Sequence, residues 1–196
     1  MSTLFLIGIN DIIFNFKPLI KAQLFADDIT ITYSRKNVHS INEHLQAAIN
    51  SLQNWLKTIG LHFSPQKNQD ILFTRKNKLQ LPPKLHLSDI EIKFTDTIKI
   101  LGLIFDENIS WMLYLKSLKY FCIKTLNIIK ILSNNNWGAD KGTLLETYKM
   151  LIRSRLDYGC TVYNSKTTLK KKVESSSHTA LRLATGAYRT CPKKIL

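Results

Sequence analysis

Two adjacent aspartates, Asp27 and Asp28, stand between two short segments that are typical of β-strands. Residues 29–33 read ITITY, and β-branched and aromatic side chains of this kind favour strands. Residues 21–25, KAQLF, form the other arm. The pattern predicts a β-hairpin with residues 26–28 at or near its turn, where a rigid support projects the side chains.

The acidic pair is a candidate metal site. Carboxylates in contact repel each other, and a divalent cation removes this penalty because it binds carboxylate oxygens well. In two-metal phosphoryl transfer, ions about 3.5–4 Å apart stabilise the attacking and the leaving oxygen. An isolated Asp-Asp pair also occurs at ordinary solvated turns, so both interpretations stay open for Asp27 and Asp28 alone. The apolar arms favour the metal site, since surface turns are more often surrounded by Gly, Asn or Pro.

The hydrophobic pattern predicts an α+β fold. Apolar residues recur at three- and four-residue steps over residues 41–59, which indicates a helix packed against a sheet. Ser40 with Glu43 is a candidate capping box, and Gly60 is a candidate C-cap glycine. Short strands are expected at residues 61–63, 70–73, 85–87, 91–94 and 98–105, and helices at residues 111–132, 141–155 and 169–185. A mixed part, residues 1–108, therefore precedes a helical part, residues 109–196.

Positive charge is concentrated in the helical part. Residues 111–196 hold sixteen basic and four acidic side chains, a net charge of +12 out of +14 for the whole chain. A polyanion is the partner that such a surface favours, with nucleic acid ahead of an acidic membrane, and a solvated basic surface is the alternative.

The cysteines and the first residues indicate a protein of the cell interior. Cys122, Cys160 and Cys191 are widely spaced and odd in number, which favours reduced thiols over a zinc site or a disulfide framework. Residues 1–16 are apolar, but they lack a basic start and include Asp11, so we expect buried protein and not a signal peptide. No segment reaches transmembrane length, and a nuclear or cytoplasmic location, or both, is expected.

Several segments in order resemble one family. Phe25-Ala26-Asp27-Asp28 resembles the [FY]-x-Asp-Asp motif of reverse transcriptases, and its LFADD form is similar to that of non-LTR retrotransposon enzymes of the jockey type. The further segments that resemble this group are residues 4–12 before the motif, residues 64–68 with 71–73 as the next palm motif, residues 98–103 with Asp106 and Trp111 as the primer grip, and residues 151–159 and 181–190 as the thumb and post-thumb region. The resemblance covers nearly the whole chain.

The resemblance implies an RNA-directed DNA polymerase with a partial palm, made of catalytic hairpin, helix and short antiparallel strands, and a helical thumb and post-thumb region. It implies Mg²⁺, or Mn²⁺ in its place, with Asp27 as a direct ligand and Asp28 as a supporting carboxylate. Phe25 would pack beside the primer end. Lys67 would act near the pyrophosphate leaving group as a cation or proton donor, and an ordinary exposed loop lysine is the alternative.

The resemblance also implies an RNA template and a DNA primer as partners. Leu101 and Gly102 would let the backbone approach the primer closely, or they form a β-bulge. Further residues expected to contact nucleic acid are Lys99, Arg153, Arg155, Lys170, Lys171 and Lys172. For the run of three lysines, a phosphate contact, a nuclear import patch and a solvated helix terminus all remain open.

Three functional hypotheses follow. The first is a truncated RNA-directed DNA polymerase that is inactive as an isolated chain, because the family's upstream aspartate and its fingers have no counterpart in these residues. The second is a basic module that binds RNA or DNA without catalysis. The third is a chain that does not fold stably, because its palm strands would lack sheet neighbours.

Overall fold

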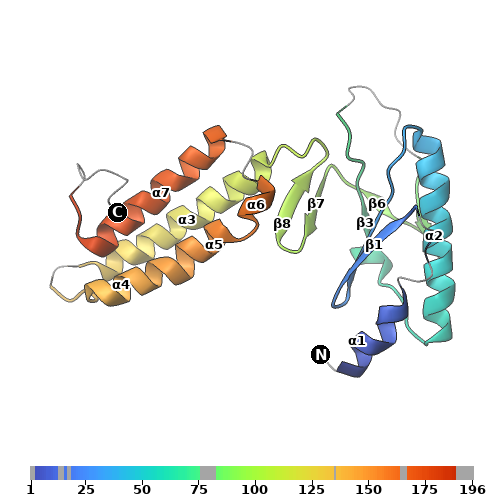
Figure 1. Cartoon of the computed structure of the whole chain (residues 1–196), viewed down its shortest axis with the longest axis horizontal. Coiled ribbons are helices and arrows are strands. Elements are labelled where there is room, and N and C mark those ends of the chain that lie inside the picture. The colour runs from blue at the N-terminus through green and yellow to red at the C-terminus, as the bar shows by residue number, and fades with distance from the viewer. Residues whose placement is uncertain are drawn as a thin grey trace. The chain divides into compact units, whose positions relative to one another are not determined.

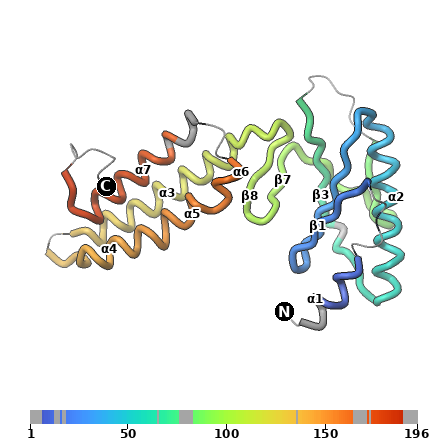
Figure 2. The backbone as a smooth tube through the Cα atoms, viewed as in Figure 1, coloured from blue at the N-terminus to red at the C-terminus, as the bar shows by residue number. Residues whose placement is uncertain are grey.

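The chain forms two compact units in the computed structural model, which describes residues 3–12, 16, 19–75, 83–134, 136–163 and 167–188. The units are Met1–Asp96 and Thr97–Leu196 (Figures 1 and 2). Within the described residues, helices occur together with four small sheets of two strands each. This confirms the predicted α+β class. Cys191 and the last two residues of the segment 181–190 lie outside the described residues.

The first unit contains α1 (Thr3–Asn10), β1 (Lys21–Phe25), β2 (Asp28–Thr32), α2 (Val38–Thr58), the 3₁₀ turn η2 (Pro65–Lys67), β3 (Gln69–Asp70), β4 (His86–Leu87), β5 (Ile90–Glu91) and β6 (Lys93–Phe94). The antiparallel pairs are β1–β2 and β4–β5, whereas β3 and β6 pair in parallel. The expectation of antiparallel strands alone was therefore wrong. Residues 71–92 form a connection long enough for β6 to return in the direction of β3.

Two expected strands are shorter or absent. Residues 61–63 and 71–73 have the composition of strands, but neither segment is a strand in the described structure, and the ladder in this region is formed by Gln69–Asp70. Near the N-terminus, Ile9 and Ile12 are buried while Ile7 is 64% exposed. Residues 7–12 are thus buried on one side only.

Helix α2 begins one turn earlier than its apolar stripe suggests. Asn37 is the N-cap residue, and its side chain accepts a hydrogen bond of 3.0 Å from the backbone N–H of His39. The prediction of a capping box made by Ser40 and Glu43 was wrong, because both residues lie inside a helix that already starts at Val38. An Asn in the extended conformation is as good an N-cap as Ser.

The C-terminus of α2 confirms the predicted glycine stop. Gly60 has a φ of 72°, in the left-handed region that glycine adopts without strain. Its N–H donates to the Lys57 carbonyl at 3.3 Å, and the N–H of Leu61 donates to the Leu56 carbonyl at 3.0 Å. These two bonds form a Schellman motif, which satisfies carbonyls that the helix end leaves free.

Helix α2 packs against β4. Ile49 of the helix is buried with Leu85 and Leu87 in a small apolar cluster. The Gln46 side chain adds two hydrogen bonds of 2.8 Å, because its amide donates to the His86 carbonyl and accepts from the His86 N–H. A side-chain amide here satisfies the backbone groups that another strand would otherwise pair.

The second unit contains β7 (Thr97–Ile100), β8 (Leu103–Asp106), α3 (Met112–Leu132), α4 (Lys141–Tyr148), the π-helical segment η3 (Lys149–Arg153), α5 (Ser154–Asp157), α6 (Cys160–Tyr163) and α7 (Thr167–Thr185). The three predicted helices are confirmed to within a few residues. The compact unit includes the β7–β8 hairpin, which the sequence places with the preceding strands. The physical reason is Leu103, which is buried in the helical core. The identity of the two parts as palm and thumb stays a prediction.

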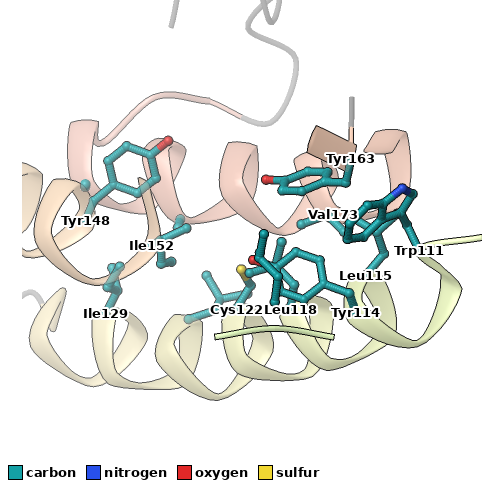
Figure 3. Packing of buried hydrophobic residues seen from close by; sticks show 14 of the residues in the cluster. Trp111, Tyr114, Leu115, Leu118, Cys122, Ile129, Tyr148, Ile152, Tyr163 and Val173 are labelled. Carbon is teal, nitrogen blue, oxygen red and sulfur yellow. The ribbon is translucent and has the colours of Figure 1, made fainter. Parts of the chain in front are cut away.

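Helix α3 is the centre of this core. Its buried side chains point toward η3, α6 and α7 in Figure 3. The largest side chains of this core with almost no exposure are Leu115, Cys122, Ile129 and Ile152. Burial of each large aliphatic side chain contributes about 1.5–3 kcal/mol. Burial also raises the pKa of the Cys122 thiol, which therefore packs as a neutral, apolar group.

An aromatic cluster connects β8 to the helices. The ring centroid of Trp111 lies 4.8 Å from that of Phe105 and 6.5 Å from that of Tyr114, which lies 5.3 Å from that of Tyr163. Desolvation, and to a smaller extent the electrostatic effect of the neighbouring Tyr114, raises the pKa of Tyr163 to about 12. Tyr163 thus stays protonated and donates its hydroxyl hydrogen to the Leu156 carbonyl.

Asp106 organises the turn between β8 and α3. Its carboxylate accepts hydrogen bonds from the Ser110 N–H, at 3.0 and 2.9 Å, and from the Trp111 N–H at 3.0 Å. Ile109 and Trp111 have φ values of 52° and 60°, a left-handed conformation that costs about 1–2 kcal/mol per residue. The carboxylate offsets part of this strain.

No described helix is long and apolar enough to cross a membrane.

The substitution Asp106→Asn tests this role through pH. Desolvation raises the pKa of Asp106, but the hydrogen bonds from Ser110 and Trp111 together bring it below its ordinary value. The carboxylate therefore contributes stability above the unfolded-state pKa of about 3.9, and this contribution is lost as the pH falls through the lower folded-state pKa. We expect Asp106→Asn to be about 1 kcal/mol less stable at neutral pH and to lose less stability on acidification, as measured by urea unfolding. An acid dependence equal to that of the wild type, with Glu107→Gln as the control, would contradict this role.

Candidate functional site

The predicted hairpin is confirmed, with its acidic pair at the tip. Strands β1 and β2 are in register from Lys21 with Thr32 to Phe25 with Asp28. Ala26 and Asp27 are therefore the two central residues of the turn. Ala26 has a φ of 53°, a positive value that residues other than glycine rarely adopt.

Both carboxylates at the tip are exposed. Phe25, the cross-strand partner of Asp28, is 63% exposed beside them. The described part of the chain contains no group of three or more His, Cys, Asp or Glu side chains that could hold a metal ion. Mg²⁺ often binds one or two carboxylates and completes its shell with waters and substrate phosphates. Asp27 and Asp28 fit such an open site, but they do not form a closed one.

Lys67 lies at the end of η2 and is exposed. The loop is held by the Ser64 carbonyl, which accepts from the Lys67 N–H at 3.2 Å and from the Asn68 side-chain amide at 2.9 Å. Within the described residues, no ion pair or hydrogen bond joins the Lys67 ammonium to the acidic pair. The role of Lys67 near a leaving group stays a prediction.

Leu101 and Gly102 form the turn of the β7–β8 hairpin, so this segment is a tight turn and not a bulge. Ile100 pairs with Leu103 on either side of it. The φ values of Leu101 and Gly102 are 47° and 84°, and positive φ at both central positions is typical of a type I′ turn. Leu101, at 44% exposure, presents the turn to solvent.

Tyr158 and Gly159, which connect α5 to α6, pack against this turn. The Tyr158 hydroxyl donates to the Leu101 carbonyl, and a Cβ on Gly102 would lie 3.6 Å from the Tyr158 ring. Gly159 has a φ of 68°, and a Cβ there would lie 2.8 Å from a methyl group of Leu103. Only glycine at position 159 lets the helical segment approach the hairpin this closely.

A cleft of about 530 Å³ lies between the β7–β8 hairpin and helices α3 and α5. We name it the Arg155 cleft; its lining residues are Lys99, Gly102, Ile104, Tyr114, Ser117, Leu118, Phe121, Ser154, Arg155 and Tyr158. The fold thus brings together Lys99, Gly102 and Arg155, three residues that the sequence singled out separately. The Arg155 guanidinium carbon lies 4.9 Å from the centroid of the Phe121 ring.

The other predicted cations lie elsewhere. Arg153 forms an ion pair of 3.5 Å with Asp157 and lines a different cleft, of about 270 Å³. Lys171 is exposed on α7, whereas the side chains of Lys170 and Lys172 lie outside the described residues.

Sequence reasoning missed Phe121 and the hydrogen bond of Tyr158. The one available signal was the Tyr158-Gly159 pair, which marks the end of a helical segment. In the structure this pair packs closely against the β7–β8 hairpin.

Residues 2–105 match the model of the family described as reverse transcriptase (RNA-dependent DNA polymerase). The chain belongs to this family. It is also 20% identical, over 164 residues, to a protein of Drosophila melanogaster described as a probable RNA-directed DNA polymerase from transposon X-element. That alignment covers 83% of this chain but only 18% of the relative. No solved structure matches the chain. The family match includes the β1–β2 hairpin and the Leu101–Gly102 turn.

Substitutions of Ala26 test the geometry of the acidic tip. A β-branched side chain is a strong outlier at positive φ, whereas glycine adopts it freely. We expect Ala26→Val to weaken the hairpin by about 1–2 kcal/mol and to accelerate amide hydrogen exchange across β1 and β2. Ala26→Gly is the matched control, and we expect it to keep the protection of these amides. Equal protection in both variants would contradict the positive φ at this position.

The variant Tyr158→Phe tests the contact that holds the second hairpin. It removes only the hydroxyl that binds the Leu101 carbonyl. We expect a loss of about 0.5–1 kcal/mol in the free energy of unfolding, since the bond is partly exposed to solvent. Amide exchange at Leu101 and Gly102 should accelerate as well. Tyr188→Phe is the control, because Tyr188 is 86% exposed; an equal effect of both substitutions would argue against the contact.

Proposed function

We propose that this chain is part of a non-LTR retrotransposon reverse transcriptase of the jockey type, and that it contributes the catalytic hairpin and a primer-binding region to RNA-directed DNA synthesis. The observation that carries the proposal is the exposed Asp27–Asp28 pair at a two-residue hairpin turn within the residues that match the family. In this proposal residues 1–108 are part of the palm, and residues 109–196 are the thumb and post-thumb region.

The acidic tip would hold Mg²⁺ through Asp27 as a direct ligand, with Asp28 as a supporting carboxylate. When bound, the ions supply electrostatic stabilisation of the attacking and leaving oxygens during nucleotidyl transfer. Phe25, exposed on the same hairpin, would pack beside the primer end. The Lys67 ammonium would lie near the pyrophosphate leaving group, where it would either stabilise its negative charge or donate a proton to it.

The second unit would hold the RNA template and DNA primer. Leu101 and Gly102 present a turn whose backbone a strand can approach, and Lys99 and Arg155 supply positive charge beside it. Lys170, Lys171 and Lys172 would add phosphate contacts from α7. Arg153 is the weaker contributor of the set, because Asp157 already pairs with its guanidinium.

We further propose that the 196-residue polypeptide does not extend primers when it acts alone. Two adjacent carboxylates give Mg²⁺ few protein ligands, and the described residues offer no third metal-binding side chain near them. A polymerase segment that supplies another carboxylate and a nucleotide pocket would complete the site.

Mn²⁺ is a direct probe for the acidic tip because its paramagnetism broadens nearby amide signals even when binding is weak. We expect Mn²⁺ to broaden the amide signals of residues 25–30 selectively in the NMR spectrum of the full chain. The double variant Asp27→Asn with Asp28→Asn should abolish the effect, and the exposed Asp89 serves as the control for an isolated carboxylate. Equal broadening at Asp89 and at the tip would contradict a metal site.

The activity is tested in a chimera in which these residues replace the matching segment of an active polymerase of the same family. We expect Mg²⁺-dependent extension of a primer on an RNA template, lost in Asp27→Asn. The isolated chain should show no incorporation. Incorporation that persists in Asp27→Asn would contradict the assignment of the catalytic tip.

A non-catalytic nucleic-acid-binding module is the second candidate. The concentration of positive charge in residues 111–196 favours it. Both candidates expect an affinity for RNA/DNA duplex that falls steeply with salt. Only the first expects selective Mn²⁺ broadening at the hairpin tip and extension by the chimera, so the same two measurements separate them.

A further inference from the structure

The Arg155 cleft has the chemistry of a site for a phosphate ester. Two cationic side chains, Lys99 and Arg155, line it, and no Asp or Glu does. Within the described residues, neither Lys99 nor Arg155 takes part in an ion pair, in contrast to Arg153. Charges without a carboxylate partner favour an anionic ligand, and phosphate is the anion that nucleic acids supply.

The guanidinium of Arg155 is already in position to stack. Its central carbon lies over the Phe121 ring, 4.9 Å from the ring centroid, and both residues line the cleft. A guanidinium is planar, and unpaired bases stack on guanidinium planes as they do on aromatic rings. Because the Phe121 contact fixes the side chain before a ligand arrives, less entropy is lost on binding.

The volume of the Arg155 cleft fits a single nucleotide. At about 530 Å³ it falls within the range of about 300–1,000 Å³ that is typical of small-molecule sites, so it can enclose one nucleotide but not a duplex. The Ser117 hydroxyl, on the α3 side of the cleft, adds a hydrogen-bonding group. Gly102 forms another part of the wall and has no side chain that would block entry.

We propose that the Arg155 cleft binds a single unpaired nucleotide of an RNA or DNA strand, with the base stacked on the Arg155 guanidinium and the phosphate at Lys99. This inference rests on the proposed nucleic-acid function and goes beyond it, because it assigns to the second unit a preference for single-stranded ends over continuous duplex. An enzyme with this site distinguishes a primer or template end from the interior of a duplex.

Three fluorescent RNA/DNA probes test the proposal with the full chain by fluorescence anisotropy. The first is blunt, the second carries a short unpaired overhang, and the third carries the same overhang as abasic sugar phosphates. Stacking of one base contributes about 1–3 kcal/mol. We therefore expect the overhang with bases to bind roughly tenfold more tightly than the abasic overhang.

Variants of the cleft residues test whether the higher affinity for the overhang with bases arises in the Arg155 cleft. Arg155→Gln and Phe121→Leu should bring the two overhang probes to equal affinity, and Phe121→Leu keeps both the net charge and an apolar side chain. Arg155→Lys should retain the affinity for the abasic overhang but lose the preference for bases, because an ammonium has no stacking plane. Lys130→Gln is the control for the loss of one charge, since this exposed residue of α3 does not line the cleft. Thermal unfolding of each variant verifies the fold.

The outcomes separate this inference from the proposed function. Equal affinity of the wild type for bases and abasic phosphates would overturn the nucleotide site and leave the nucleic-acid function intact. A preference for bases that persists in both Arg155→Gln and Phe121→Leu would also overturn it. If the wild type binds none of the three probes, the proposed nucleic-acid function of this unit fails together with the inference.

Discussion

The hydrogen bond from the Tyr158 hydroxyl to the Leu101 carbonyl, together with the close approach of Gly159 to Leu103, positions the β7–β8 hairpin against the helices of the second unit. A two-stranded hairpin is at best marginally stable in water by itself. The β7–β8 hairpin is held because its tip contacts Tyr158, the residue that follows α5, and its base enters the helical core through the aromatic rings around Trp111. The cleft between hairpin and helices exists only while both contacts persist.

The β1–β2 hairpin is supported differently. Its far end is tied to α2, where the Tyr33 ring stacks on His44 with centroids 4.9 Å apart. Its tip, in contrast, is exposed, and Ala26 has a left-handed conformation that costs an L residue about 1–2 kcal/mol. Strain at a functional turn persists only where the surroundings maintain it. A tip that is exposed and strained in this way is suited to contact further protein, metal or nucleic acid, which is consistent with the two-carboxylate site being open.

The periodicity of apolar residues predicted the helices and strands that their own side chains specify. It did not predict how distant strands pair. The apolar stripes of α2 and α3 and the β-branched arm of β2 specify their elements by their own side chains. The parallel pairing of β3 with β6 depends on where a long connection returns, which no local pattern encodes. Asn37 and Ser40 both suit an N-cap, and the structure places the cap at Asn37, whose side chain accepts a hydrogen bond from the His39 N–H. The hairpin with Asp27 and Asp28 at its tip was predicted because two carboxylates between apolar, β-rich arms stand out in the sequence. The contact between Phe121 and Arg155, in contrast, joins two residues that no local pattern marks.

The two arginines of α5 and η3 explain why net charge alone could not locate a nucleic-acid site. Arg153 and Arg155 are two residues apart and were equal candidates by sequence. The π-helical segment ends between them, and they line different clefts. Asp157, four residues after Arg153, forms an ion pair with its guanidinium. Arg155 instead lies over the Phe121 ring, and no carboxylate of the described residues forms an ion pair with it. The cations that are available to an anionic ligand therefore depend on local packing, which a charge count does not contain.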